Sequence, residues 1–340
     1  MKKYFLIFFL VLTSIFFSRG IIIGDDLFIL RTFRDSSPEK IEELALNISK
    51  DYDAVVLHLG SRYPFERGSF FFYRRSKENL YLFSKYLNDL NVKFYLWIFD
   101  SFGGEQFLNL YEDRHNLIKE NLEILESLNI IYDGIIIDLE WINLDGNFFN
   151  NKKYIEFLQM LREQMPQDKE LKAFASLIDS DLENIKRGYD IFSLFEIVDS
   201  LIPMLYIIDG DFYKRNDSFM PYLNDNRVNS ILKYYSQYSK ISLAISQNRG
   251  IIIERDNFFY FIKTVNNIEF LPESFLNFRK DVNYYYDIYY YRVLEDTIII
   301  KNDESEETIY KDEIVYYYAP KNTLTNHADY FWEYYLMNKE

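Results

Sequence analysis

The sequence predicts an α/β fold, namely a (β/α)8 barrel with a small β-rich insertion before its last strand. Short apolar runs alternate with longer amphipathic segments, in units of about 40 residues, and such units form parallel sheets. Eight of these units close a barrel. The open doubly wound alternative would need a glycine-rich turn after its first strand, and residues 31–34 (RTFR) contain no glycine. With 340 residues and 49% hydrophobic content, the chain can bury a large core.

The expected strands are short runs rich in β-branched and aromatic residues, such as AVVLHL and KFYLWIF. They are residues 27–32, 54–59, 93–99, 134–139, 172–177, 201–206, 241–246 and 313–318. The first helix begins after Ser37, a capping residue, with Pro38 at a position where a missing N–H costs nothing. Helical spacing of apolar residues predicts the later helices over residues 78–90, 113–128, 152–165, 189–197, 227–238, 255–265 and 326–337.

Residues 284–311 break the strand–helix alternation, because apolar runs flank the charged segment KNDESEE. This pattern predicts one or two inserted hairpins, at about residues 280–312, between the seventh helix and the eighth strand. No Pro/Gly-rich linker divides the chain. The expected organisation is a signal peptide or N-terminal anchor over residues 1–20 and one barrel domain over residues 21–340.

The first residues have the pattern of an export signal. Lys2 and Lys3 precede a largely apolar run over residues 4–17, which is shorter than the roughly 20 residues of a membrane span. Cleavage is expected near residues 18–20, and without cleavage residues 4–17 would attach the protein to a membrane. The chain has no Cys, which excludes disulfides and thiolate metal sites. We expect an extracytoplasmic protein, either periplasmic, secreted or membrane-anchored.

Charge and composition exclude several function classes. The formal net charge of −15 argues against nucleic-acid binding, which needs a basic face. His58, His115 and His327 are scattered without metal-ligand spacing, and no phosphate-binding loop is present. We therefore expect no metal and no cofactor. The sequence does not predict an oligomeric state.

Two carboxylates stand at the end of the expected strand at residues 134–139. Strand alternation places Gly134, Ile136, Asp138 and Glu140 on one face, while the opposite face is wholly apolar. The carboxylates are about 6.6 Å apart at their Cα atoms, so each raises the other's proton affinity. One suits a general acid and the other an orienting charge. Helix capping or ion pairing would explain the same two residues without catalysis.

Three motifs carry a resemblance to a known family. Residues 133–140 (DGIIIDLE) resemble the DGxDxDxE signature of glycoside hydrolase family 18, the chitinases and endo-β-N-acetylglucosaminidases. Residues 101–104 (SFGG) resemble the family's SxGG at the end of the third strand, and residues 204–206 (MLY) resemble the start of its MxYD at the sixth. The likeness extends over about residues 27–340.

This resemblance implies hydrolysis of β-linked N-acetylglucosamine-containing glycans by a substrate-assisted, retaining mechanism. Glu140 would protonate the glycosidic oxygen, and Asp138 would hold the 2-acetamido group whose carbonyl oxygen attacks the anomeric carbon. Tyr206 would hydrogen-bond the same group, and Asp133 would belong to the network behind the pair. The residues expected to bind substrate are Asp100, Ser101, Gly103, Gly104, Trp141, Met204 and Asp209.

The sequence departs from the family pattern at three places. Ile136 replaces the middle Asp, Ile207 replaces the Asp of MxYD, and Tyr317 or Tyr318 stands where a tryptophan is expected. Asp209 lies two residues beyond Ile207. These departures leave two alternatives open. One is a non-catalytic carbohydrate-binding or surface-interaction barrel, and the other is a barrel glycosidase for a sugar without an acetamido group.

Overall fold

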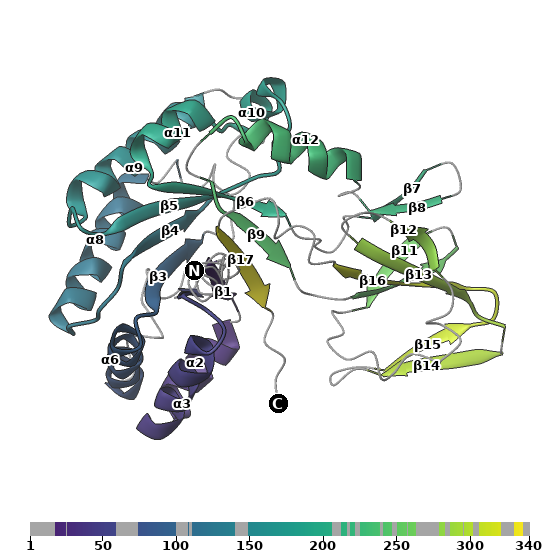
Figure 1. Ribbon diagram of the computed structural model, residues 1–340, viewed down its shortest axis with the longest axis horizontal. Coiled ribbons are helices and arrows are strands. Elements are labelled where there is room, and N and C mark those ends of the chain that lie inside the picture. The colour runs from purple at the N-terminus through teal and green to yellow at the C-terminus, as the bar shows by residue number, and fades with distance from the viewer. Residues whose placement is uncertain are drawn as a thin grey trace, which may run out of the picture.

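The computed structural model describes residues 18–24, 26–58, 74–99, 108, 111–139, 149–205, 212–215, 218–221, 225–238, 241–246, 250–256, 258–262, 279–282, 286–294, 296–301, 306–320 and 330–335. Within these residues, a parallel barrel carries helices on its outside and a β-rich region on one side (Figure 1). The predicted (β/α)8 fold class with a β-rich insertion is confirmed.

Eight parallel strands close the barrel in the order β1-β17-β9-β6-β5-β4-β3-β2. The strands are β1 (Ser18–Ile23), β2 (Ala54–His58), β3 (Lys93–Phe99), β4 (Gly134–Asp138), β5 (Glu170–Ala175), β6 (Ser200–Leu205), β9 (Leu243–Ser246) and β17 (Tyr330–Tyr335). The barrel closes where β1 pairs with β17, at opposite ends of the chain.

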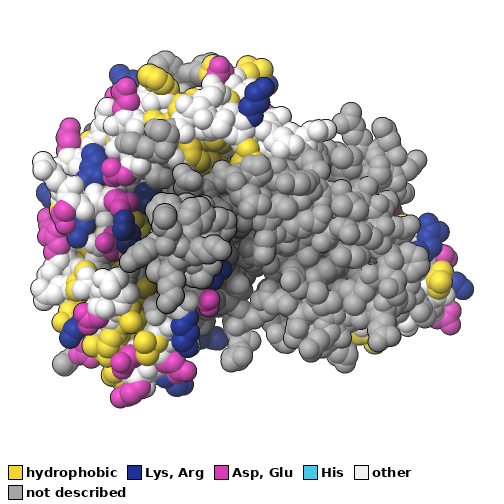
Figure 2. All heavy atoms as spheres, viewed as in Figure 1, with side chains coloured by type: hydrophobic (Ala, Val, Ile, Leu, Met, Phe, Trp, Pro, Cys, Tyr) yellow, Lys and Arg dark blue, Asp and Glu magenta, His cyan; other side chains and the backbone are white. Residues whose placement is uncertain are grey.

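Helices pack on the outside of the barrel (Figure 1). They are α2 (Asp26–Asp35), α3 (Pro38–Ser49), α6 (Arg74–Asp89), α8 (Tyr111–Ser127), α9 (Phe149–Gln164), α10 (Asp181–Arg187), α11 (Ile191–Ile197) and α12 (Asp225–Tyr235). Figure 2 shows acidic and basic side chains interspersed over this helical side. None of the helices in the described ranges is long and apolar enough to cross a membrane.

The β-rich region lies between β9 and β17 in the sequence. Its five-stranded antiparallel sheet has the order β11-β10-β16-β13-β12. These strands are β10 (Gly250–Arg255), β11 (Phe258–Ile262), β12 (Arg279–Val282), β13 (Tyr286–Arg292) and β16 (Ile314–Pro320). Two hairpins complete the described strands, β14 (Thr297–Lys301) with β15 (Glu306–Tyr310) and β7 (Phe212–Arg215) with β8 (Ser218–Pro221).

Strand alternation separates two hydrophobic cores. In β4, Ile135 and Ile137 join the outer core between strands and helices, whereas Ile136 joins the layer inside the barrel. This inner layer is formed by Ile22, Ala54, Val56, Tyr95, Trp97, Ile136, Phe174, Ile202, Met204 and Ala244. The predicted separation of Ile136 from Ile135 and Ile137 onto opposite faces of β4 is therefore confirmed, and the face of Ile136 is the inward one.

Three aspartates hold neighbouring strands together at the amino end of the barrel. Each precedes a strand, and its Oδ2 accepts a hydrogen bond from a backbone N–H of the strand before it in the chain. The N–H of the same aspartate donates to the carbonyl of that same residue. The pairs are Asp53 with Arg19, Asp133 with Phe94, and Asp199 with Leu171, at 3.2, 2.7 and 2.8 Å for the carboxylate bonds. We call Asp53, Asp133 and Asp199 the amino-end aspartates.

The expected strand at residues 27–32 is wrong, because these residues lie in α2. Ile29 and Phe33 are four residues apart and both buried, which is the spacing of a helix face. The first barrel strand is instead β1, where Ile21, Ile22 and Ile23 form an apolar run suited to a strand covered on both sides.

The last strand–helix pair was also predicted wrongly. Residues 313–318 belong to β16 of the inserted sheet, so neither Tyr317 nor Tyr318 lies on the last barrel strand as expected. The last barrel strand is β17, which lies within the expected helix at 326–337. The expected helix at 255–265 is replaced by the end of β10 and by β11. Both mispredicted helices contain aromatic runs, FFYFI and YFWEYY, which favour strands. The inserted strands consequently extend from Gly250 to Pro320.

Candidate functional site at the carboxyl end of the barrel

Asp138 is the last residue of β4 and lies at the carboxyl end of the barrel, where enzymes of this architecture carry their active sites. It shares the inward face of β4 with Ile136, and its side chain is 3% exposed. Trp97 of β3 donates a hydrogen bond from Nε1 to Asp138 Oδ2 at 3.2 Å. An indole N–H can only donate, so in this bond Asp138 Oδ2 is always the acceptor.

Aromatic rings surround the donor of this bond. The Trp97 ring lies against His58 of β2, with centroids 4.6 Å apart, and against Phe174 of β5 at 5.5 Å with the rings steeply inclined. Met204 of β6, a predicted substrate-binding residue, is buried in the same inner layer. Asp138 therefore projects into a mostly apolar and aromatic environment, in which its orientation depends on a few polar contacts.

Ile136 lies directly below Asp138 on the inward face and is fully buried. In the β3–β4 register it is opposite Trp97. The position that carries an aspartate in the family signature is thus filled here by an aliphatic side chain packed within the inner layer. No group of three or more His, Cys, Asp and Glu that could hold a metal occurs in the part of the chain that the structure describes.

An ion-pair cluster lies at the amino end of the barrel. Glu170 accepts hydrogen bonds from Lys93 Nζ at 2.7 Å and from Tyr95 Oη at 3.0 Å, and Lys172 Nζ lies 2.8 Å away. Burial raises the pKa of Glu170, but its hydrogen bonds with Lys172 and Lys93 outweigh burial and lower the pKa to about 2. The charged groups of this cluster pair with one another, which suits a structural role.

Asp133 was predicted to support the catalytic pair, and the structure places it elsewhere. It precedes β4 at the amino end, five residues and about 16 Å of strand away from Asp138. Its carboxylate accepts the hydrogen bond from Phe94 N as one of the amino-end aspartates. The role of Asp133 in a network behind the pair stays a prediction, and its Oδ2 is hydrogen-bonded to the backbone of β3.

Trp97 is a polar partner of Asp138 that the sequence motifs do not identify. The alternation of KFYLWIF already places Trp97 on the face of Tyr95, toward the barrel interior. Eight of the predicted site residues lie outside the described residues. They are Asp100, Ser101, Gly103, Gly104, Glu140, Trp141, Tyr206 and Asp209.

No protein-family model matches the sequence, and no curated protein matches it significantly. Several solved structures are similar to this chain. The C-terminal domain of a putative chitinase from Desulfitobacterium hafniense DCB-2 is similar at a TM-score of 0.63 and 14% identity, covering 93% of this chain and 92% of that one. A chitinase from Chromobacterium violaceum ATCC 12472 gives 0.60 and 12%, with 94% and 93% covered. The spore cortex-lytic enzyme SleL of Bacillus megaterium QM B1551 gives 0.60 and 12%, with 93% and 70% covered. At such identities the likeness shows a shared fold.

Proposed function

We propose that this protein is an exported glycoside hydrolase that cleaves β-linked N-acetylglucosamine-containing glycans. The observation that carries the proposal is the buried, inward Asp138 at the carboxyl end of β4, held by the indole of Trp97. It stands in a barrel that shares its fold with chitinases and a spore cortex-lytic enzyme. The three motifs that resemble family 18 add support from the sequence.

In the proposed reaction Asp138 orients the 2-acetamido group of the substrate, and Tyr206 donates a hydrogen bond to it. The carbonyl oxygen of that group attacks the anomeric carbon while the glycosidic C–O bond breaks. Glu140 gives its proton to the departing oxygen, then takes a proton from the water that opens the cyclic intermediate. Two displacements at the same carbon retain its configuration. The remaining predicted residues, Asp100, Ser101, Gly103, Gly104, Trp141, Met204 and Asp209, would contact the glycan.

Ile136 favours a second candidate function, a barrel that binds carbohydrate without cleaving it. An isoleucine cannot share a proton or a charge with Asp138, and here it is fully buried in the inner layer. Asp138 would then be protonated without help from the neighbouring carboxyl group that the family signature carries. A carbohydrate-binding protein needs only a binding surface of the right shape and hydrogen bonds at the carboxyl end of the barrel. Replacement of the signature aspartate by Ile136 would leave that function intact.

The test is release of a chromophore from an N-acetylchitooligosaccharide glycoside by a purified chain that includes β1. General acid catalysis contributes typically about 10²- to 10⁴-fold, so Glu140→Gln should lose activity by that factor. Asp133→Asn is the matched control, because its carboxylate lies at the amino end. Binding of the oligosaccharide without turnover by the unmodified protein would refute hydrolysis and support the binder. Turnover of glycosides that lack an N-acetyl group would instead indicate a different sugar.

A further inference from the structure

The carbonyl of Leu139 is held by a tyrosine from a distant part of the chain. Leu139 separates Asp138 from Glu140 in the sequence and follows the last pairs that β4 makes with β3 and β5. Its carbonyl therefore lies beyond both described ladders, and a buried carbonyl needs a donor. Tyr189, between α10 and α11, supplies it, donating from Oη to Leu139 O at 2.7 Å.

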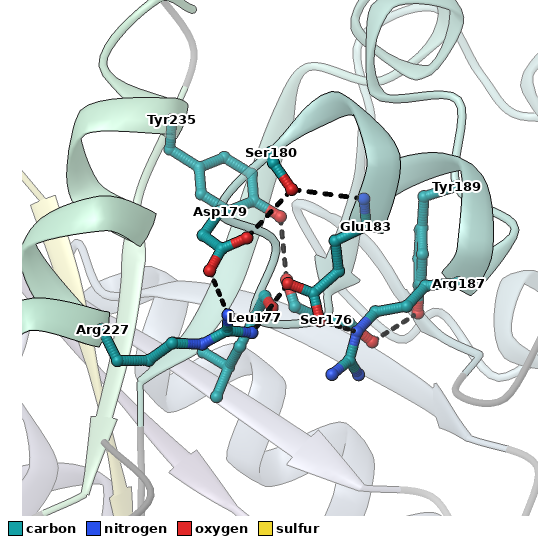
Figure 3. A network of polar contacts seen from close by, with 9 residues as sticks. All are labelled: Ser176, Leu177, Asp179, Ser180, Glu183, Arg187, Tyr189, Arg227 and Tyr235. Atoms are coloured by element: carbon teal, nitrogen blue, oxygen red, sulfur yellow. Dashed lines mark hydrogen bonds and ion pairs between the residues drawn. The ribbon is translucent and has the colours of Figure 1, made fainter. Parts of the chain in front are cut away.

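Tyr189 is itself part of a hydrogen-bond chain that crosses three elements (Figure 3). Ser176, directly after β5, donates from Oγ to Tyr189 Oη at 3.3 Å. Tyr235 of α12 donates from its hydroxyl to the Ser176 carbonyl at 2.9 Å. The chain from Tyr235 through Ser176 and Tyr189 to Leu139 thus connects α12 and the end of β5 to the end of β4.

The segment that carries Ser176 is fixed at a second point. Arg227, in the first turn of α12, pairs with Asp179 and with Glu183, the latter at 2.8 Å, and donates to the carbonyl of Leu177 at 3.1 Å (Figure 3). These three charged side chains are 20–22% exposed, and Arg227 is always protonated. Since α12 holds this segment through both Arg227 and Tyr235, the donor to Leu139 rests on a rigid support.

The neighbouring Tyr154 provides a comparison for the hydroxyl of Tyr189. Tyr154 of α9 packs edge-to-face on Tyr189, with centroids 6.1 Å apart, and both rings are buried. The Tyr154 hydroxyl makes no hydrogen bond to any described residue. Burial raises the pKa of Tyr154 well above its ordinary value, so this hydroxyl stays neutral. The two buried rings therefore differ in their hydrogen bonds, since the Tyr189 hydroxyl donates to Leu139 and accepts from Ser176.

We propose that Tyr189 is a positioning residue for the acid Glu140. The peptide group is planar, so an anchored Leu139 carbonyl sets the direction in which the chain continues toward Glu140. Ser176 and Tyr235 hold the anchor in place. This inference rests on the proposed hydrolysis, and it assigns to residues far along the chain a part in placing the proton donor relative to Asp138.

The experiment compares Tyr189→Phe with Tyr154→Phe. Both variants keep the ring and lose one buried hydroxyl, but only Tyr189→Phe loses the bonds to Leu139 and Ser176. Small displacements of a catalytic group cost up to about 100-fold, so we expect kcat of Tyr189→Phe to fall about 10- to 100-fold with KM within about twofold. Tyr154→Phe should keep both constants. Equal kcat values for the two variants would overturn the proposal.

Amide hydrogen exchange supplies a readout that does not need turnover. Tyr189→Phe should accelerate exchange in the peptide that follows Leu139, while Tyr154→Phe should leave it as in the unmodified protein. If the unmodified protein hydrolyses no glycan, the proposed function fails, and exchange alone decides whether Tyr189 positions this peptide. Equal exchange in the two variants would overturn positioning. Faster exchange in Tyr189→Phe with unchanged kcat in an active enzyme would also overturn it.

Discussion

The indole N–H of Trp97 donates to the carboxylate of Asp138 across the β3–β4 pair, at 3.2 Å and out of contact with bulk water. A hydrogen bond between buried groups contributes about 1–3 kcal/mol when its loss leaves the other group unsatisfied. Orientation of Asp138 and stability of the barrel therefore depend on the same contact.

Replacing Trp97 by Phe should keep most of the ring packing against His58 and Phe174 while removing the donor. We expect a loss of about 1–3 kcal/mol in unfolding free energy by urea denaturation. A double-mutant cycle with Asp138→Asn isolates the pair, and we expect a coupling energy of at least about 0.5 kcal/mol. Strict additivity of the two substitutions would contradict the assignment of this bond.

Substitution of Asp133 by Ala should affect stability rather than chemistry. Its Oδ2 satisfies the N–H of Phe94 at the amino end, so we expect a loss of about 1–3 kcal/mol in unfolding free energy. Asp53→Ala removes the corresponding bond to Arg19 and is the matched comparison. In glycan hydrolysis, kcat of the folded Asp133→Ala protein should stay within about threefold of the unmodified value. A much larger loss would return Asp133 to the catalytic network.

Lowering the pH should reduce the free energy of unfolding through protonation of Glu170. Its pKa is about 2 in the folded protein and lies below the ordinary value of 4.5. A carboxyl whose pKa is depressed on folding contributes stability above its unfolded pKa and loses it as the pH falls. Unfolding free energy should therefore decline from about pH 4.5 toward pH 2. Glu170→Gln should show a shallower decline in urea denaturation at each pH, and an identical slope would exclude Glu170 as a contributor.

A chain that starts at residue 27 should fail to form the closed barrel. Such a chain lacks β1, which pairs with both β2 and β17. We expect a chain of residues 18–340 to unfold cooperatively in circular dichroism and a chain of residues 27–340 to show no such transition.

The pairing of β1 with β2 and β17 also makes a prediction for cleavage of the N-terminal segment. Cleavage after Gly20 would remove half of β1. If the N-terminal segment is a cleaved export signal, mass spectrometry should find the first residue of the mature protein at or before Ser18.

The sequence predicted the strands from β2 to β6 and β9 within a few residues, because their β-branched and aromatic runs agree with burial inside an α/β barrel. It failed at both ends. The run LFILRT satisfies a strand and a helix face alike, and only its packing in α2 distinguishes the two. Residues 330–335 contain three tyrosines and a tryptophan, and their place between β1 and β9 is a tertiary choice that local periodicity does not encode.

In the candidate site, alternation along β4 correctly placed Ile136 in the inner layer and separated it from its neighbours. The partner of Asp138 was not predictable in the same way, because the contact depends on the register between β3 and β4. The distance of Asp133 from Asp138 has a related cause. A motif gives the order of its residues, but a strand of five residues puts its two ends at opposite rims of the barrel.

The join between β1 and β17 has a consequence for the newly made chain. The strand that closes the barrel is the last described segment, and it follows the whole inserted sheet. Until it has been synthesised, β1 and β9 each present an unpaired row of backbone N–H and C=O groups, which invites pairing with another chain. Closure also demands contacts of very large sequence separation, which form slowly. A chain truncated before residue 330 would therefore be prone to aggregation, and such fragments should depend on chaperones more than the full-length chain does.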